Sequence, residues 1–104
     1  MFVLYVVCKD QTEAKTIAKT LLDEDLIACA NTWPTVSYYE WEGDFVEDSE
    51  IVLLMKTKKD NYHQIETRVL ALHSYETPAI FGWEVDKVNP SYMEWLQAKC
   101  QKTE

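Results

Sequence analysis

The chain has 104 residues, a usual length for one folded domain, and 47% of them are apolar. That apolar share, with only two glycines and three prolines, predicts an ordered globular fold. Eighteen acidic residues against ten basic ones give a formal charge of −8, which repels nucleic-acid phosphates and anionic membranes and attracts cations. We therefore expect a single domain over residues 1–104 that binds neither nucleic acid nor membrane.

Two features predict a cytoplasmic protein. The longest apolar run, Phe2 to Cys8, is too short for a membrane span, and no basic residue precedes it as in a secretory signal. The cysteines Cys8, Cys29 and Cys100 are odd in number and widely spaced, which is typical of reduced thiols rather than of a disulfide framework.

The first elements are a strand and a helix. Residues 2–7 are rich in β-branched and aromatic side chains and predict a buried strand. From Thr12 to about Asp25 apolar residues recur at helical spacing, and Asp10 or Thr12 can cap the start. The expected buried face holds Ala14, Ile17, Ala18, Leu21 and Leu22, and the polar face Glu13, Lys15, Lys19 and Asp23.

A long hairpin follows. Residues 27–41 are rich in Thr, Val, Tyr and Trp, with Pro34 in the middle, which predicts one bent strand or two short ones. Glu42-Gly43-Asp44 is a turn signal, and an extended run from Ile51 to Thr57 belongs to the returning arm, which begins at about Phe45. Both arms are longer than a typical strand, so we expect the hairpin to project beyond the helices.

The remaining pattern completes the fold class. Asp60 is expected to cap a helix from Asn61 to about Leu72, and residues 79–85 predict a last strand. Asn89-Pro90 then opens a short helix that reaches about Lys99. The order is βαββαβ with an extra C-terminal helix, so we predict an α+β, ferredoxin-like fold.

Bulky side chains on both faces of the first arm predict self-association. Tyr39 and Trp41 share one face, and Val36 and Tyr38 share the other. Because water-exposed strands alternate more cleanly, both faces of the projecting ribbon need a cover, which another copy of the chain can provide. The alternative is that the aromatic residues simply fill a small core.

The chain resembles the CutA family of divalent-cation tolerance proteins along nearly its whole length. The segments that carry the resemblance are Leu26-Ile27-Ala28-Cys29-Ala30-Asn31, Ser37-Tyr38-Tyr39-Glu40-Trp41-Glu42-Gly43, Lys56-Thr57, Leu72-His73-Ser74-Tyr75-Glu76-Thr77-Pro78 and Tyr92-Met93-Glu94-Trp95-Leu96. The resemblance implies a ferredoxin-like homotrimer with the hairpins packed between subunits. It also implies a role in tolerance of divalent cations, notably copper.

The resemblance further implies a metal site at Cys8 and His73. The chain departs from the family pattern at Leu72, where some members carry a second histidine, and at Ser74, where proline is usual. Thiolate and imidazole suit copper(I) or zinc, and copper is expected ahead of zinc or other divalent cations. The alternative is that Cys8 is a small buried hydrophobe and His73 a helix C-terminal residue stabilised by the helix dipole.

The other candidate groups have simpler interpretations. Cys29 is expected in the core, Cys100 has no activating partner and can be exposed, and His63 is expected on the surface. The carboxylates around the hairpin turn predict a solvated acidic tip that discourages edge pairing; they are Glu42, Asp44, Glu47, Asp48 and Glu50. No serine, cysteine or glycine-rich motif supports catalysis, so we expect no enzyme.

Two functions therefore compete. The first is a trimeric cation-tolerance protein that binds soft metal ions. The second is a regulatory or scaffolding trimer, similar in architecture to PII-type signalling proteins, that binds a small ligand or a partner protein in the clefts between subunits.

Overall fold

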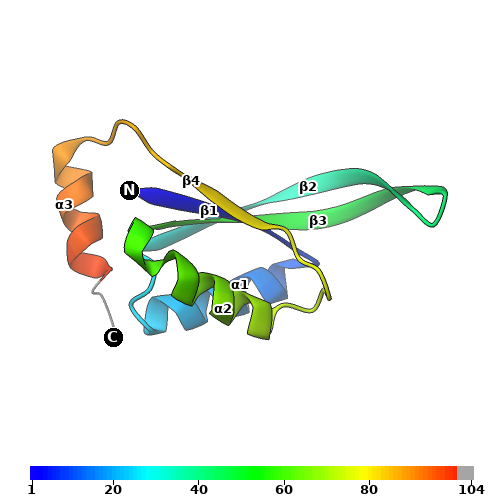
Figure 1. Cartoon of the computed structure of the whole chain (residues 1–104), viewed down its shortest axis with the longest axis horizontal. Helices are drawn as coiled ribbons and strands as arrows, with labels where there is room; N and C mark the ends of the chain where they lie inside the picture. Colours follow the sequence, from blue (N-terminus) through cyan, green and yellow to red (C-terminus); the bar gives the residue numbers. More distant parts are fainter. Residues whose placement is uncertain (101–104) are drawn as a thin grey trace.

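The computed structural model describes residues 1–100 and has the predicted α+β architecture. The elements are β1 (Phe2–Cys8), α1 (Gln11–Asp23), β2 (Cys29–Trp41), β3 (Asp44–Thr57), a 3-10 turn (Lys59–Asn61), α2 (Tyr62–Leu72), β4 (Ile80–Glu84) and α3 (Pro90–Lys99). The strands form one antiparallel sheet in the order β2-β3-β1-β4. Helices α1 and α2 lie together along one face of this sheet (Figure 1). The ferredoxin-like prediction is confirmed.

The first helix begins where its sequence predicts, with one difference in its buried face. Asp10 caps α1, because its side chain accepts a hydrogen bond from the Glu13 backbone N–H. Leu22, predicted as core, is 42% exposed, whereas Glu13, predicted on the polar face, is only 9% exposed. The helix therefore turns a carboxylate toward the sheet, and that carboxylate belongs to the candidate site described below.

The hairpin is one continuous ribbon. Its pairing runs without interruption from Cys29 opposite Lys56 to Trp41 opposite Asp44. Pro34 is tolerated because β2 is an edge strand. Glu42 and Gly43 both have positive φ, of 51° and 85°, so two residues close the turn. Figure 1 shows the hairpin extending well past the two helices, as predicted.

The second half of the chain differs from prediction at the start of α2. Asp60 does not cap that helix, because the chain first makes a 3-10 turn and α2 begins at Tyr62 without a side-chain cap. Strand β4 lies against β1, and Figure 1 places α3 at the end of the sheet opposite the hairpin tip. Pro90 occupies the first turn of α3, as predicted.

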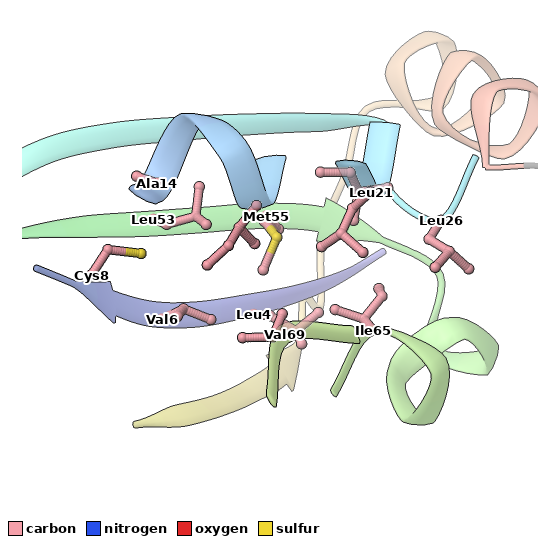
Figure 2. Close-up of a cluster of buried hydrophobic side chains, with 12 residues drawn as sticks. Leu4, Val6, Cys8, Ala14, Leu21, Leu26, Leu53, Met55, Ile65 and Val69 are labelled. Carbon is pink, nitrogen blue, oxygen red and sulfur yellow. The ribbon is translucent and has the colours of Figure 1, made fainter. Parts of the chain in front are cut away.

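The core lies between the sheet and the two helices. Figure 2 shows its side chains, contributed by β1, β3, α1, α2 and the segment between α1 and β2, with Cys8 at one end of the cluster. A second, smaller cluster beneath α3 contains Ala28, Leu96 and Cys100, with Cys29 packed against it. Cys100 is fully buried, so the idea that it is exposed is wrong, whereas Cys29 is only partly buried.

Large apolar side chains on the hairpin remain exposed. Tyr38 and Trp41 are each 65% exposed, and Phe45 is 70% exposed and stacked on Tyr38. They therefore do not fill the core of this chain, which excludes the alternative considered for these three residues. No helix among residues 1–100 is long and apolar enough to cross a membrane.

Candidate metal centre

Three side chains from separate elements meet at the edge of the main core. Cys8 ends β1, Glu13 lies in the first turn of α1, and His73 directly follows α2. One potential ligand atom from each, the thiol sulfur, a carboxylate oxygen and a ring nitrogen, all lie within 4.8 Å of one another. The structure thus brings together both predicted metal residues and adds a third, Glu13.

Cys8 is a protonated thiol in this environment. Its side chain is completely buried, and burial, followed by the nearby carboxylates of Glu13, Asp10 and Glu50, raises the pKa of the thiol to about 12. A metal ion that binds this sulfur must therefore displace a proton.

Glu13 ties two turns of the chain together. Its Oε1 accepts the Lys9 backbone N–H at 2.9 Å, and its Oε2 accepts the Ser74 backbone N–H at 2.7 Å. Burial raises the pKa of this carboxyl, but the hydrogen bonds from these N–H groups outweigh burial, and the pKa lies below its usual range. Glu13 is therefore an ionised carboxylate beside Cys8 at neutral pH.

The hydrogen bonds of His73 fix its tautomer. The Val7 carbonyl, 2.7 Å from Nε2, can only accept, so Nε2 carries the proton. The Tyr75 backbone N–H, 3.1 Å from Nδ1, can only donate, so Nδ1 presents its lone pair. This Nδ1 lies 3.8 Å from Glu13 Oε2. A ring nitrogen that donates its proton to a backbone carbonyl, and so leaves the lone pair of the other nitrogen to bind, is the usual arrangement of a metal-binding histidine.

The donor set fits a soft or borderline ion after a small contraction. Ligand atoms around a tetrahedral zinc ion lie about 3–4 Å apart, given metal–ligand distances of about 2.0–2.3 Å. The three atoms here lie within 4.8 Å of one another, which is a wider spacing than that of a bound ion's ligands. Binding would also require Nδ1 of His73 to give up its bond to Tyr75. The cluster is thus a candidate three-ligand site in which backbone N–H groups hold the carboxylate of Glu13 and Nδ1 of His73.

The two departures from the family pattern have distinct consequences. Leu72 is partly buried against the main core, so this position contributes packing rather than a ligand. Ser74 supplies the N–H that holds Glu13 Oε2, which a proline could not do. The remaining histidine, His63, has a 93% exposed side chain and lies outside the cluster, as predicted.

Glu13 is the site residue that sequence reasoning missed. Its helical position indicated the polar face, but the Asp10-x-x-Glu13 spacing is that of a capping box, in which the residue at the third helical position turns back toward the preceding backbone. Glu13 does so, bonding to Lys9 rather than to the cap itself. That spacing, directly after Cys8, was the available signal.

The fold and the cluster define a class: small ferredoxin-like proteins with a long hairpin and a cysteine, a carboxylate and a histidine gathered at the end of the first strand. Comparison with known sequences agrees. The profile described as CutA1 divalent ion tolerance protein matches residues 2–99, and the chain belongs to this family.

Several relatives match over almost their full length. The divalent-cation tolerance protein CutA of Pyrococcus horikoshii is 39% identical over 102 residues, which cover 98% of this chain and 100% of that protein. Its counterpart in Thermus thermophilus is 38% identical over 96 residues, which cover 91% of this chain and 93% of that one.

Solved structures agree in fold. The crystal structure of CutA1 from Pyrococcus horikoshii superposes with a TM-score of 0.94 at 38% identity, covering 98% of this chain and 100% of that one. The periplasmic divalent cation tolerance protein CutA from Archaeoglobus fulgidus gives a TM-score of 0.93 at 29% identity, with 97% and 100% covered. This chain is a divalent-cation tolerance protein of the CutA family.

Proposed function

We propose that this chain works as a homotrimer that binds soft metal ions, copper foremost, at Cys8, Glu13 and His73, without catalysing a reaction. The observation that carries the proposal is the convergence of three donor atoms from β1, α1 and α2 within 4.8 Å. The relatives are named for divalent-cation tolerance, which supports a role in binding metal ions.

The donor chemistry favours copper. A thiolate is a soft ligand that selects copper(I) or zinc, and imidazole suits copper and zinc alike. A closed zinc site requires four donors, and the cluster offers three, so a copper(I) ion of low coordination number fits it better. The cytoplasmic location stays a prediction; a reducing compartment would keep both Cys8 and copper in the required state.

The trimer is supported by the hairpin. Tyr38, Trp41 and Phe45 are each at least 65% exposed on a ribbon that projects into solvent, and β2 is an unpaired sheet edge. Exposed aromatic side chains of this kind are typical of the cores of protein interfaces.

Isothermal titration calorimetry of the reduced protein with copper(I), copper(II) and zinc tests the metal proposal. We expect saturable binding near one ion per chain that a Cys8→Ser, His73→Ala variant loses. A Cys29→Ser, His63→Ala variant is the matched control, because it removes the same donor types outside the cluster and should bind normally. Equal binding by the two variants would contradict the site, and light scattering on the same samples tests the trimer.

The second candidate, a PII-like regulatory or scaffolding trimer, is favoured by one observation. Both oxygens of Glu13 and Nδ1 of His73 already accept backbone N–H groups, as expected of a purely structural latch. If this second function is correct, we expect metal titrations to give no saturable heat and light scattering still to find a trimer.

A further inference from the structure

The segment that joins α2 to β4 covers two of the ligand atoms of the metal cluster. The backbone N–H of Ser74 donates to Glu13 Oε2 at 2.7 Å. The next N–H along the chain, that of Tyr75, donates to His73 Nδ1 at 3.1 Å. These two acceptor atoms lie 3.8 Å apart, and their residues form the cluster together with Cys8. We call residues 74 and 75 the strap.

The side chain of Tyr75 holds the strap in this position. Its hydroxyl donates to Glu50 Oε2 at 2.5 Å, and its ring packs against the imidazole of His73, with the ring centroids 4.8 Å apart. Glu50 is only 8% exposed, so the acceptor is a buried carboxylate. Burial, and then the bond to Glu50, raise the pKa of Tyr75, so its hydroxyl remains a proton donor at neutral pH. A hydrogen bond to a charged acceptor is among the stronger ones in a protein.

The carboxylate that anchors the strap belongs to the same pair of strands as the metal cysteine. Glu50 directly precedes Ile51 on β3, and Ile51 pairs with Cys8 at the end of β1. Figure 1 shows the segment between α2 and β4 at this end of the sheet, from which the hairpin projects. The strap therefore connects the metal cluster to the base of the hairpin.

A metal ion and the closed strap compete for the same atom. Nδ1 of the neutral His73 ring has a single lone pair, and the N–H of Tyr75 occupies it. A metal ion can bind Nδ1 only after that N–H has moved away. The N–H of Ser74 belongs to the adjacent residue, and the peptide unit between the two is planar and rigid, so the two N–H groups move together.

We propose that the strap is a gate on the metal cluster, and that Tyr75 is the positioning residue that sets the affinity for the metal. Opening the strap moves the backbone of Tyr75 and breaks the bond from its hydroxyl to Glu50. The free energy of that bond therefore opposes metal binding, and a bound metal ion releases Glu50 at the base of the hairpin. This inference rests on the proposed function, because it concerns the regulation of the same site.

Calorimetry of the reduced protein with copper(I) compares Tyr75→Phe with the parent chain. This change removes only the anchoring hydroxyl, so copper(I) affinity should rise about tenfold. Tyr39→Phe is the matched control, because its hydroxyl also donates to a carboxylate on β3, that of Asp48, at 3.2 Å. That bond lies outside the strap, and its loss should change the affinity less than twofold. A Tyr75 that only supported the fold would lower the affinity when it is truncated.

Amide hydrogen exchange gives a second readout, and its first arm uses the unaltered chain. Copper(I) should speed the exchange of the Ser74 and Tyr75 amides about tenfold, because binding opens the strap, whereas a ligand ordinarily protects the amides around it. Without metal, Tyr75→Phe should speed exchange of the same two amides, and Tyr39→Phe should leave them unchanged.

The outcomes distinguish this inference from the proposed function. If Cys8→Ser abolishes copper(I) binding but Tyr75→Phe binds as the parent does, the metal site stands and the gate is wrong. Protection of the Ser74 and Tyr75 amides by copper(I) would also overturn the gate. Binding by Tyr75→Phe but not by the parent would support it, since the closed strap then excludes the ion. Binding by neither chain would contradict the proposed function and the gate with it.

Discussion

Replacing Glu13 by alanine should destabilise the protein strongly, although the residue lies on a helix face that its sequence marks as polar. The carboxylate accepts two backbone N–H groups, from Lys9 and Ser74, at 2.9 and 2.7 Å, and is 9% exposed. A hydrogen bond to a charged group contributes about 1.5–3 kcal/mol, so losing both should cost about 3–6 kcal/mol of unfolding free energy. Glu13→Gln keeps one acceptor and should cost about 2 kcal/mol.

Urea unfolding at one fixed protein concentration measures this effect, because the stability of an oligomer depends on concentration. Asp23→Asn on the same helix is the control. The Asp23 side chain is 66% exposed and, among residues 1–100, forms an ion pair with Lys19 alone, so its loss should cost less than about 0.5 kcal/mol. If Glu13→Ala lowered the free energy of unfolding no more than the control, the two hydrogen bonds from Lys9 and Ser74 to Glu13 would not stabilise the fold.

The pH dependence has a definite sign. The pKa of Glu13 is lower in the folded protein than its ordinary value of 4.5, so the contribution is complete above about pH 4.5 and is lost as the pH falls through the lower, folded value. The stability difference between the parent chain and Glu13→Gln should therefore be constant from neutral pH down to about 5.5 and should shrink below 4.5.

Three further predictions concern other positions. Ser74→Pro removes the N–H that holds Glu13 Oε2, and His73 before it is extended, a conformation that tolerates a following proline. Because this oxygen is then free to bind a metal ion, calorimetry should find copper(I) affinity raised about tenfold. No gain would mean that the N–H does not compete with the metal for Glu13. Gly82→Ala places a Cβ atom against the Val3 backbone oxygen of β1 and should cost about 3 kcal/mol of unfolding free energy, measured in urea. Gly43→Ala has open space around the new Cβ but a φ of 85°, so it should cost about 1–2 kcal/mol. The reverse order would contradict the packing of β4 on β1. Burial raises the pKa of Cys100, so iodoacetamide at pH 8 should label Cys29 first. Mass spectrometry that finds Cys100 labelled first would contradict its burial.

The fold could be predicted because local and periodic signals agree along the chain. The β-branched run at residues 2–7, the Glu42-Gly43 turn and Pro90 at the start of α3 each specify their element locally. The errors lie where tertiary contacts override such signals. Leu22 has the spacing of a core residue but is exposed, and Asp60 has the chemistry of a cap, but the chain makes a 3-10 turn there.

The candidate site was only partly predictable. Cys8 and His73 lie 65 positions apart in the sequence, and only the resemblance to the family joined them. The burial of Glu13 was not predicted, because helical periodicity gives the face on which a residue lies. It does not show that the side chain bonds to the backbone before the helix. Glu50 was predicted in a solvated acidic tip but is only 8% exposed, so that part of the prediction is wrong. Its partner Tyr75 comes from a segment far along the chain, which no local pattern indicates.

The most direct test of the metal proposal is the proton count on copper(I) binding, measured by calorimetry in two buffers of different ionisation enthalpy. The thiol of Cys8 has a pKa of about 12 and Nδ1 of His73 already lacks a proton, so binding at neutral pH should release about one proton per ion. Cys8→Ser should abolish both the binding and the release. Binding without proton release, or release that persists in Cys8→Ser, would contradict the site.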